Sequence, residues 1–242
     1  GNWHGATAVT PAIAGSGTAV AFSMTAGTIS AGGSTTNVDQ FGVSCAGVRA
    51  WLFDLGTQTS SRIDYPGLGD PTCPLTSTGG AASTTNPFPD ASGARVVYAT
   101  TAANLGDGDT DNTIDIHLWD NSGGLEQVSL VSVNAGGTKL NANSATPVIS
   151  SDGTTVAFDS LASNVGSPTM SGTHEIYVVN LNSPSGIKRG SQSGATAPSS
   201  QALFPSLDQN GRFLSFVSSA NNLDPAETSG TLQVYVVDLA TT

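Results

Sequence analysis

The amino-acid sequence predicts an all-β protein made of one unit that is repeated four times. The repeat is the first observation behind this prediction. The second is that apolar and polar residues alternate within each unit, which is the period of a half-buried strand. The third is that no stretch shows convincing helical periodicity. A chain of 242 residues can bury its core as one all-β domain, so we expect residues 1–242 to form a single domain.

Each unit begins with a proline and a predicted β-hairpin. A glycine follows six residues after the proline, and an aromatic residue follows five residues after the glycine. Proline is tolerated as the first residue of a strand, where no ladder hydrogen bond is lost, and the sequences "SDG" and "QNG" suit a tight turn. The four copies start near residues 11, 87, 147 and 205 and read "PAIAGSGTAVAFS", "PFPDASGARVVYA", "PVISSDGTTVAFD" and "PSLDQNGRFLSFV".

Two further strands complete the unit. Three of the units carry an Asn-Leu or Asn-Val pair after the hairpin, at Asn104, Asn164 and Asn222, and a polar loop follows. We expect a third strand in "RAWLFD", "DIHLWD", "EIYVVN" and "QVYVVD", and a short fourth strand in "EQVSLVSV" and, more weakly, in "SSRID" and "GIKRGS". Four antiparallel strands with long loops are typical of a propeller blade, so the sequence predicts a β-propeller of about four four-stranded blades.

The two cysteines, Cys45 and Cys73, lie in insertions within residues 30–86 that lengthen the first unit. They supply too few ligands for a thiolate metal site, so we expect a disulfide, with two buried thiols as the alternative. A disulfide implies an oxidising compartment, and the expected location is extracellular, at the cell surface or periplasmic. The excess of 18 Asp and Glu over 7 Lys and Arg argues against nucleic acid as a partner, and no apolar run is long enough for membrane insertion.

The repeat resembles a known family. The pattern P-x-I-S-x-D-G-x-x-V-A-F-x-S-x-A-x-N-L, followed by D-I-H/Y-V-x-D, is similar to the TolB-type, WD-like propeller repeats of secreted and periplasmic bacterial proteins. The similarity extends from about Pro11 to Asp238 and implies the propeller fold. It implies no single function, because propellers serve as binding modules, enzymes and scaffolds. The chain departs from the family in blade number, since TolB-type propellers usually have six or more blades.

The last unit lacks a fourth strand, because the sequence stops at "VYVVDLATT". Three outcomes are open: the N-terminal segment "GATAVT" supplies the strand, another copy of the chain supplies it, or the edge stays unpaired. Closure within the chain would pair Gly5, Ala6, Thr7, Ala8 and Val9 with Val234, Tyr235 and Val236.

Four aspartates gather in the loop before the third strand of the second unit. Asp107, Asp109, Asp111 and Asp115 alternate with other residues, so that an extended loop would direct several oxygens at one centre, as calcium requires. The loop lacks the central glycine and distal glutamate of an EF-hand. We therefore expect a calcium site of another kind, and no organic cofactor. The alternative is a solvated turn whose aspartates accept hydrogen bonds from nearby N–H groups.

No other constellation in the sequence indicates catalysis. The three histidines show no zinc-ligand spacing, and no P-loop, dinucleotide fingerprint or G-x-S-x-G elbow is present. His117 occupies the same position of its unit as Tyr177 and Tyr235, so we expect it to pack like a tyrosine. Trp51 and Trp119 are expected to pack between blades.

Three functions remain open on the sequence. The preferred one is a secreted, non-catalytic propeller, stabilised by calcium, that binds a protein or a glycan. The second is a structural subunit of an extracellular filament or surface assembly, in which copies of the chain join by strand exchange at the last unit. The third is a polysaccharide hydrolase or lyase that uses a pair of carboxylates, whose separation a sequence does not specify.

Overall fold

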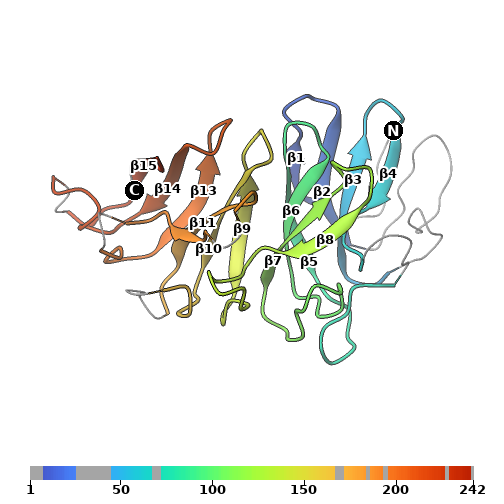
Figure 1. Ribbon diagram of the computed structural model, residues 1–242, viewed down its shortest axis with the longest axis horizontal. Coiled ribbons are helices and arrows are strands. Elements are labelled where there is room, and N and C mark those ends of the chain that lie inside the picture. The colour runs from blue at the N-terminus through green and yellow to red at the C-terminus, as the bar shows by residue number, and fades with distance from the viewer. Residues whose placement is uncertain are drawn as a thin grey trace. The chain divides into compact units, whose positions relative to one another are not determined.

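The computed structural model describes residues 8–25, 45–66, 72–166, 172–183, 186–192, 196–226 and 229–240 (Figure 1). Across these ranges all regular secondary structure is β-strand, arranged in four antiparallel sheets. The chain divides into two compact units, residues 1–130 and 131–242, and each unit contains two of the sheets. Within the described ranges no helix is long and apolar enough to cross a membrane. The all-β prediction is confirmed.

The first unit contains blades 1 and 2. In both blades consecutive strands are neighbours in the sheet, as in a simple meander. Blade 1 consists of β1 (Ala8–Ile13), β2 (Ala19–Thr25), β3 (Val48–Asp54) and β4 (Thr59–Arg62), and blade 2 of β5 (Thr84–Pro89), β6 (Arg95–Thr100), β7 (Asp115–Asp120) and β8 (Gln127–Leu130).

The second unit contains blades 3 and 4, which follow the same meander order. Blade 3 has four strands, whereas the described part of blade 4 has three. The strands of blade 3 are β9 (Ser144–Ile149), β10 (Thr155–Ser160), β11 (Glu175–Asn180) and β12 (Lys188–Arg189), and those of blade 4 are β13 (Ala202–Leu207), β14 (Phe213–Ser218) and β15 (Gln233–Asp238).

The glycine of each repeat forms the hairpin turn between the first two strands, as predicted. All four glycines have φ between 66° and 75°, a left-handed conformation that a side chain disfavours. Each N–H donates a hydrogen bond of 2.8–3.3 Å to the carbonyl three residues before it. These glycines are Gly17, Gly93, Gly153 and Gly211.

The proline of each repeat lies inside the first strand rather than at its start, so that part of the prediction was wrong. In every blade the register of the first strand with the second is irregular at this proline, as in a β-bulge. A bulge leaves one residue out of the ladder, so a proline there removes no hydrogen bond. The residue before each proline has φ between 44° and 56°: Thr10, Asn86, Thr146 and Phe204.

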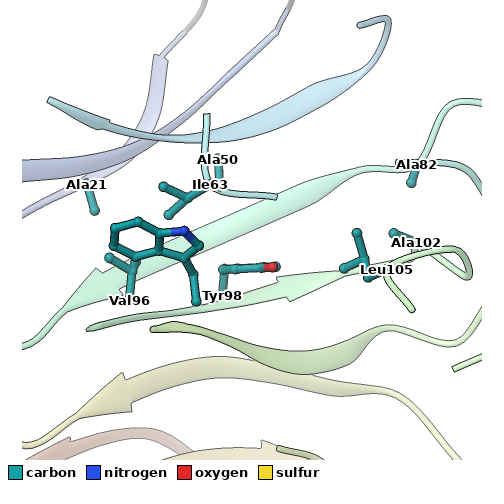
Figure 2. Close-up of a cluster of buried hydrophobic side chains, with 9 residues drawn as sticks. Ala21, Ala50, Ile63, Ala82, Val96, Tyr98, Ala102 and Leu105 are labelled. Atoms are coloured by element: carbon teal, nitrogen blue, oxygen red, sulfur yellow. The ribbon is translucent and has the colours of Figure 1, made fainter. Parts of the chain in front are cut away.

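A hydrophobic cluster joins blade 1 to blade 2. Figure 2 shows Ala21 and Ala50 of blade 1 facing Val96 and Tyr98 of blade 2. Trp119 belongs to the same cluster, which confirms that it packs between blades. The small alanines of one blade leave room for the large side chains of the next, which is how two twisted sheets reach close packing.

Trp51 packs differently from the prediction. It forms a cluster with Phe22 and Met24, and all three residues belong to blade 1. Blades 3 and 4 share a cluster of their own, in which Ala157, Ile176 and Val178 pack against Ala202, Leu214 and Phe216.

The repeated asparagine holds the loop that precedes its own blade. The Asn222 side chain accepts a bond from Ser199 N–H (2.7 Å) and donates one to the Ala197 carbonyl (2.8 Å). Asn104 and Asn164 make the same two bonds in blades 2 and 3. Each amide thereby satisfies one backbone N–H and one backbone carbonyl of the loop.

Candidate functional site: the aspartate loop and the open edge of blade 4

The aspartate loop connects β6 to β7. Carboxylate oxygens of Asp109, Asp111 and Asp115 all lie within 4.8 Å of one another, with Asp109 and Asp115 buried and Asp111 exposed. The Thr113 hydroxyl lies 2.6 Å from Asp111 Oδ1 and 2.8 Å from Asp115 Oδ2. Because one hydroxyl carries one proton, it donates to only one of these two carboxylates at a time.

The same aspartates also cap the turns of the loop. The N–H groups of Asp109 and Asp111 donate to the carboxylate two residues earlier, at 3.3 and 3.2 Å, and Thr113 N–H donates to Asp111 Oδ1 at 2.7 Å. The alternate spacing of the acids therefore builds successive Asx turns. It also brings three carboxylates together, which is the first requirement of a calcium site.

Asp107 lies apart from this group of three. Its Oδ2 lies 2.8 Å from Nε2 of His117, and both side chains are buried. Burial raises the pKa of Asp107, but the interaction with His117 and hydrogen bonds from backbone N–H groups together outweigh this effect and hold that pKa below its ordinary value.

His117 packs in the position that its repeat predicts. It pairs with Tyr98 across the strands and stacks on that ring, with centroids 5.9 Å apart. Phe158 with Tyr177, and Phe216 with Tyr235, form the same cross-strand pair in blades 3 and 4. The prediction that His117 takes the place of a tyrosine is confirmed.

Cys45 and Cys73 form a disulfide, beside a buried ionic cluster that the sequence did not indicate. Asp64 lies 3.5 Å from Arg49 and 3.8 Å from Arg62, and all three side chains are buried. Burial raises the pKa of Asp64, while the two guanidinium groups oppose the rise. Arg62 also donates to Cys45 Sγ and, at 3.2 Å, to the carbonyl of Thr72, so the cluster connects the disulfide to β4.

Blade 3 contains a histidine–carboxylate pair that sequence reasoning also missed. Nδ1 of the half-buried His174 lies 2.6 Å from Oδ2 of the buried Asp159. A histidine oriented by a carboxylate can act in acid–base catalysis when a nucleophile faces its other nitrogen. Here the Thr146 hydroxyl donates to Asp159, so it is not positioned as a nucleophile on the imidazole. No spacing in the sequence indicates this pair, because Asp159 lies in β10 and His174 in the loop before β11.

Among the described residues, blade 4 has no strand beyond β15. In blades 1 to 3 the third strand pairs with a fourth, as β3 does with β4, whereas β15 pairs only with β14 in the described part of the chain. Val234 and Val236 of β15 are 71% and 68% exposed. Their counterparts in β11, Ile176 and Val178, are 0% and 7% exposed. Within the described residues, β15 therefore has one strand neighbour, and two of its valines are exposed.

The described part of the predicted closing strand belongs to blade 1. Ala8 and Val9 belong to β1 and pair with Met24 and Ser23 of β2, so they serve as the first strand of blade 1. The reason is the bulge at Pro11, which lets the strand continue its local ladder towards the N-terminus. The remaining members of the predicted closing strand, Gly5, Ala6 and Thr7, lie outside the described residues.

Known structures resemble the fold of this chain. TolB from Acinetobacter baumannii matches with a TM-score of 0.50 at 14% identity, over 97% of this chain and 42% of that protein. The β-propeller domain of the Trilobed protease from Pyrococcus furiosus, described as having an open velcro topology, matches with a TM-score of 0.51 at 8% identity, over 98% and 56%. The chain has a TolB-type β-propeller fold.

This similarity concerns the fold. The tricorn protease matches as well, with a TM-score of 0.50 at 15% identity, over 94% of this chain and 17% of that protein. The chain thus spans less than half of that TolB-type propeller and a sixth of the protease. No protein-family model and no curated protein matches the sequence. At such identities the resemblance carries no activity or partner from one protein to another.

Proposed function

We propose that this TolB-type propeller is a non-catalytic interaction module that binds a polypeptide at the open edge of blade 4. The observation that carries the proposal is that β15 has no fourth strand beside it in the described chain, although β3, β7 and β11 each have one. An unpaired strand edge offers a row of N–H and C=O groups, and an extended peptide binds such an edge by completing the ladder.

The surroundings of the edge favour a polypeptide over a glycan. Val234 and Val236 make the adjoining face apolar, and apolar side chains of a protein cover such a face at a gain of free energy. Trp51 and Trp119, the described tryptophans, are both buried, so neither can stack on a sugar.

The proposed site of action is outside the cytoplasm, in an extracellular, cell-surface or periplasmic setting. The Cys45–Cys73 disulfide supports it, because disulfides persist where glutathione does not reduce them. The formal charge of −11 makes nucleic acids and anionic membranes poor partners, so a protein partner agrees with the electrostatics of the chain.

Calcium bound by Asp109, Asp111 and Asp115 is proposed as the stabiliser of the β6–β7 loop. Three carboxylates within 4.8 Å of one another repel when no cation is present, and calcium prefers six to eight oxygen ligands, which backbone carbonyls and water would complete. At a hundredfold excess over Kd, bound calcium would add about 2–3 kcal/mol to the free energy of unfolding.

Thermal unfolding in calcium and in chelator tests this site. We expect the midpoint of the wild type to rise with calcium and that of Asp111→Asn to stay unchanged. Asp224→Asn, which removes an exposed aspartate from another loop, is the matched control and should respond like the wild type. Equal midpoints of the wild type in calcium and chelator would overturn the calcium proposal.

Strand uptake is tested with a synthetic peptide of residues 124–133, "GLEQVSLVSV", which contains the fourth strand of blade 2. We expect a labelled peptide to bind, and the outward N–H groups of β15 to exchange with deuterium more slowly when it is bound. The same peptide with Ser129→Pro is the control, because proline removes a ladder donor. Unchanged exchange in β15 at a saturating concentration of the peptide would refute the proposal.

A further inference from the structure

We infer that the Cys45–Cys73 disulfide is a site of thiol–disulfide exchange, at which an external thiol attacks Cys73 and Cys45 leaves as a thiolate held by Arg62. The inference is independent of blade 4, because all of its residues lie within the first unit, residues 1–130. It gives the disulfide a reactivity in addition to its effect on stability.

The two cysteines differ in their access to solvent. Cys45 is 6% exposed, whereas Cys73 is half-buried. Thr72, the residue before Cys73, is exposed, so a reagent can approach from that side. Access helps to decide which sulfur of a disulfide a thiolate attacks, and the geometry therefore favours attack on Cys73.

A guanidinium group contacts the other sulfur. Arg62 Nη1 donates a hydrogen bond to Cys45 Sγ, and Arg62 Nη2 donates one to the Thr72 carbonyl at 3.2 Å. The second bond orients the guanidinium plane beside the disulfide. Arg62 is 1% exposed, so water screens little of the attraction between its charge and a thiolate at Cys45. Such a cation stabilises the thiolate and makes it a better leaving group.

The buried carboxylate of Asp64 is shared between two cations. It lies 3.5 Å from Arg49 Nη1 and 3.8 Å from Arg62 Nε. One carboxylate carries a single negative charge, so Asp64 does not balance both guanidinium groups. Arg49 donates to the Ala82 carbonyl rather than to the disulfide. Arg49 and Arg62 thus share the same carboxylate but differ in their contact with sulfur.

The exchange proceeds in two steps. The external thiol releases its proton to water, and its thiolate attacks Cys73 Sγ. A new S–S bond forms there, the bond to Cys45 breaks, and the electron pair of that bond passes to Cys45 Sγ. When the reagent is a dithiol, its second thiolate attacks the mixed disulfide and displaces Cys73, which takes up a proton from water. The dithiol is oxidised to a disulfide, and the protein gains two electrons.

Cys73 is held in place by bonds that do not involve its sulfur. The Asn104 side chain donates to the Cys73 carbonyl at 3.0 Å and accepts a bond from Leu75 N–H at 2.7 Å. Opening of the S–S bond does not break these contacts. Cys73 therefore stays near Cys45, and the exchange can run in the direction of oxidation as well.

Peptide mapping identifies the attacked sulfur. The folded wild type is treated briefly with excess glutathione and quenched with acid, and its free thiols are alkylated. Trypsin then separates the two cysteines, because Arg49 and Arg62 lie between them in the sequence. We expect glutathione on Cys73 and the alkyl group on Cys45, in at least about tenfold excess over the reverse. Glutathione mainly on Cys45, or a folded wild type that releases no thiol, overturns the inference.

Arg62→Met tests the guanidinium, with Arg49→Met as the matched control. Both variants remove a buried cation from Asp64, but only Arg62→Met removes the bond to Cys45. We expect dithiothreitol to reduce Arg62→Met at least about tenfold more slowly than Arg49→Met. Partial unfolding would expose the disulfide and speed its reduction, so a slower rate reports on the leaving sulfur. Equal rates overturn the role of Arg62.

Single-cysteine variants give a readout that does not depend on access. Cys73→Ser retains Cys45 beside Arg62, and Cys45→Ser retains Cys73. A free cysteine is mainly a thiol at neutral pH, so its thiolate absorbs little ultraviolet light there. We expect thiolate absorbance at neutral pH in Cys73→Ser, its loss in Cys73→Ser/Arg62→Met, and little in Cys45→Ser. Equal absorbance in the two single variants overturns the assignment of Cys45 as the leaving thiolate.

The source of the thiol is distinguished by rate. Reduced thioredoxin and dithiothreitol both offer a dithiol, one on a protein surface and the other on a small molecule. Faster reduction of the wild type by thioredoxin at equal concentration supports a protein dithiol as the partner, and faster reduction by dithiothreitol supports a small thiol. A disulfide that neither reagent reduces in the folded protein overturns the exchange site.

Discussion

Nε2 of His117 lies 2.8 Å from Oδ2 of Asp107, and this contact separates Asp107 from the three aspartates that follow it in the loop. His117 is buried because it occupies the tyrosine position of its strand, and Asp107 is buried against it. Asp107 thus binds a buried side chain of the blade, whereas the carboxylates of the other three aspartates lie close to one another.

Asp107→Asn should change how the stability of the protein depends on pH. The folded-state pKa of Asp107 lies below its ordinary value of 3.8, so its contribution is present above about pH 4 and is lost as the pH falls through the folded-state pKa. We expect the variant to be less stable than the wild type by about 1–3 kcal/mol at pH 6, with a smaller difference at pH 3. Urea unfolding in chelator at both values measures this, and a difference independent of pH would contradict the assigned role.

Alanine in place of Gly211 should cost more than alanine in place of Gly17. Both glycines have positive φ, which costs alanine about 1–2 kcal/mol. Only at Gly211 does the new Cβ also overlap Thr155, which adds about 1–3 kcal/mol. Urea unfolding of the two variants measures the difference, which reports the contact between blades 3 and 4. Equal losses would mean that the turn moves away from Thr155 without cost.

Asn222→Ala should weaken blade 4 by about 1–3 kcal/mol, because two backbone groups of the preceding loop lose their partners. Asn182→Ala, at an exposed turn position, is the control and should change the free energy of unfolding by less than about 0.5 kcal/mol. Asn222→Asp keeps the acceptor for Ser199 N–H but loses the donor to Ala197, so an intermediate loss is expected. Identical unfolding curves for all three variants would refute the role of the asparagine.

Replacing both cysteines by serine should lower the free energy of unfolding by about 3 kcal/mol. The reason is that the unfolded chain gains conformational entropy when the loop between the two cysteines, 28 residues apart, is no longer closed. Urea unfolding of the oxidised wild type and of the Cys45→Ser/Cys73→Ser variant measures this difference in the free energy of unfolding. Addition of a reductant should then destabilise the wild type alone. A wild type insensitive to reductant would show that the insertions are held by the Arg49–Asp64–Arg62 cluster without help from the disulfide.

Much of the fold could be predicted from local pattern. Three features depend only on a few neighbouring residues and could therefore be predicted from the sequence. They are the turn glycines, the alternation within the strands and the tyrosine position that His117 occupies. The pairs of Asp64 with Arg49 and of Asp159 with His174 were not predictable, because each joins a loop residue to a strand residue without a regular spacing. The proline position was misjudged for a related reason: a strand start and a bulge both tolerate a missing N–H, and only the register distinguishes them.

By itself the sequence determined the repeat, the strands, the hairpin turns and the excess of acid, since these follow from side-chain period and composition. Only the tertiary structure decided which surfaces are covered. Val234 and Val236 in β15 repeat the pattern of Ile176 and Val178 in β11, yet one pair is exposed and the other buried. The physical reason is that a side chain is buried only when atoms of a neighbouring element cover it. The sequence of a strand does not specify which element packs against that strand.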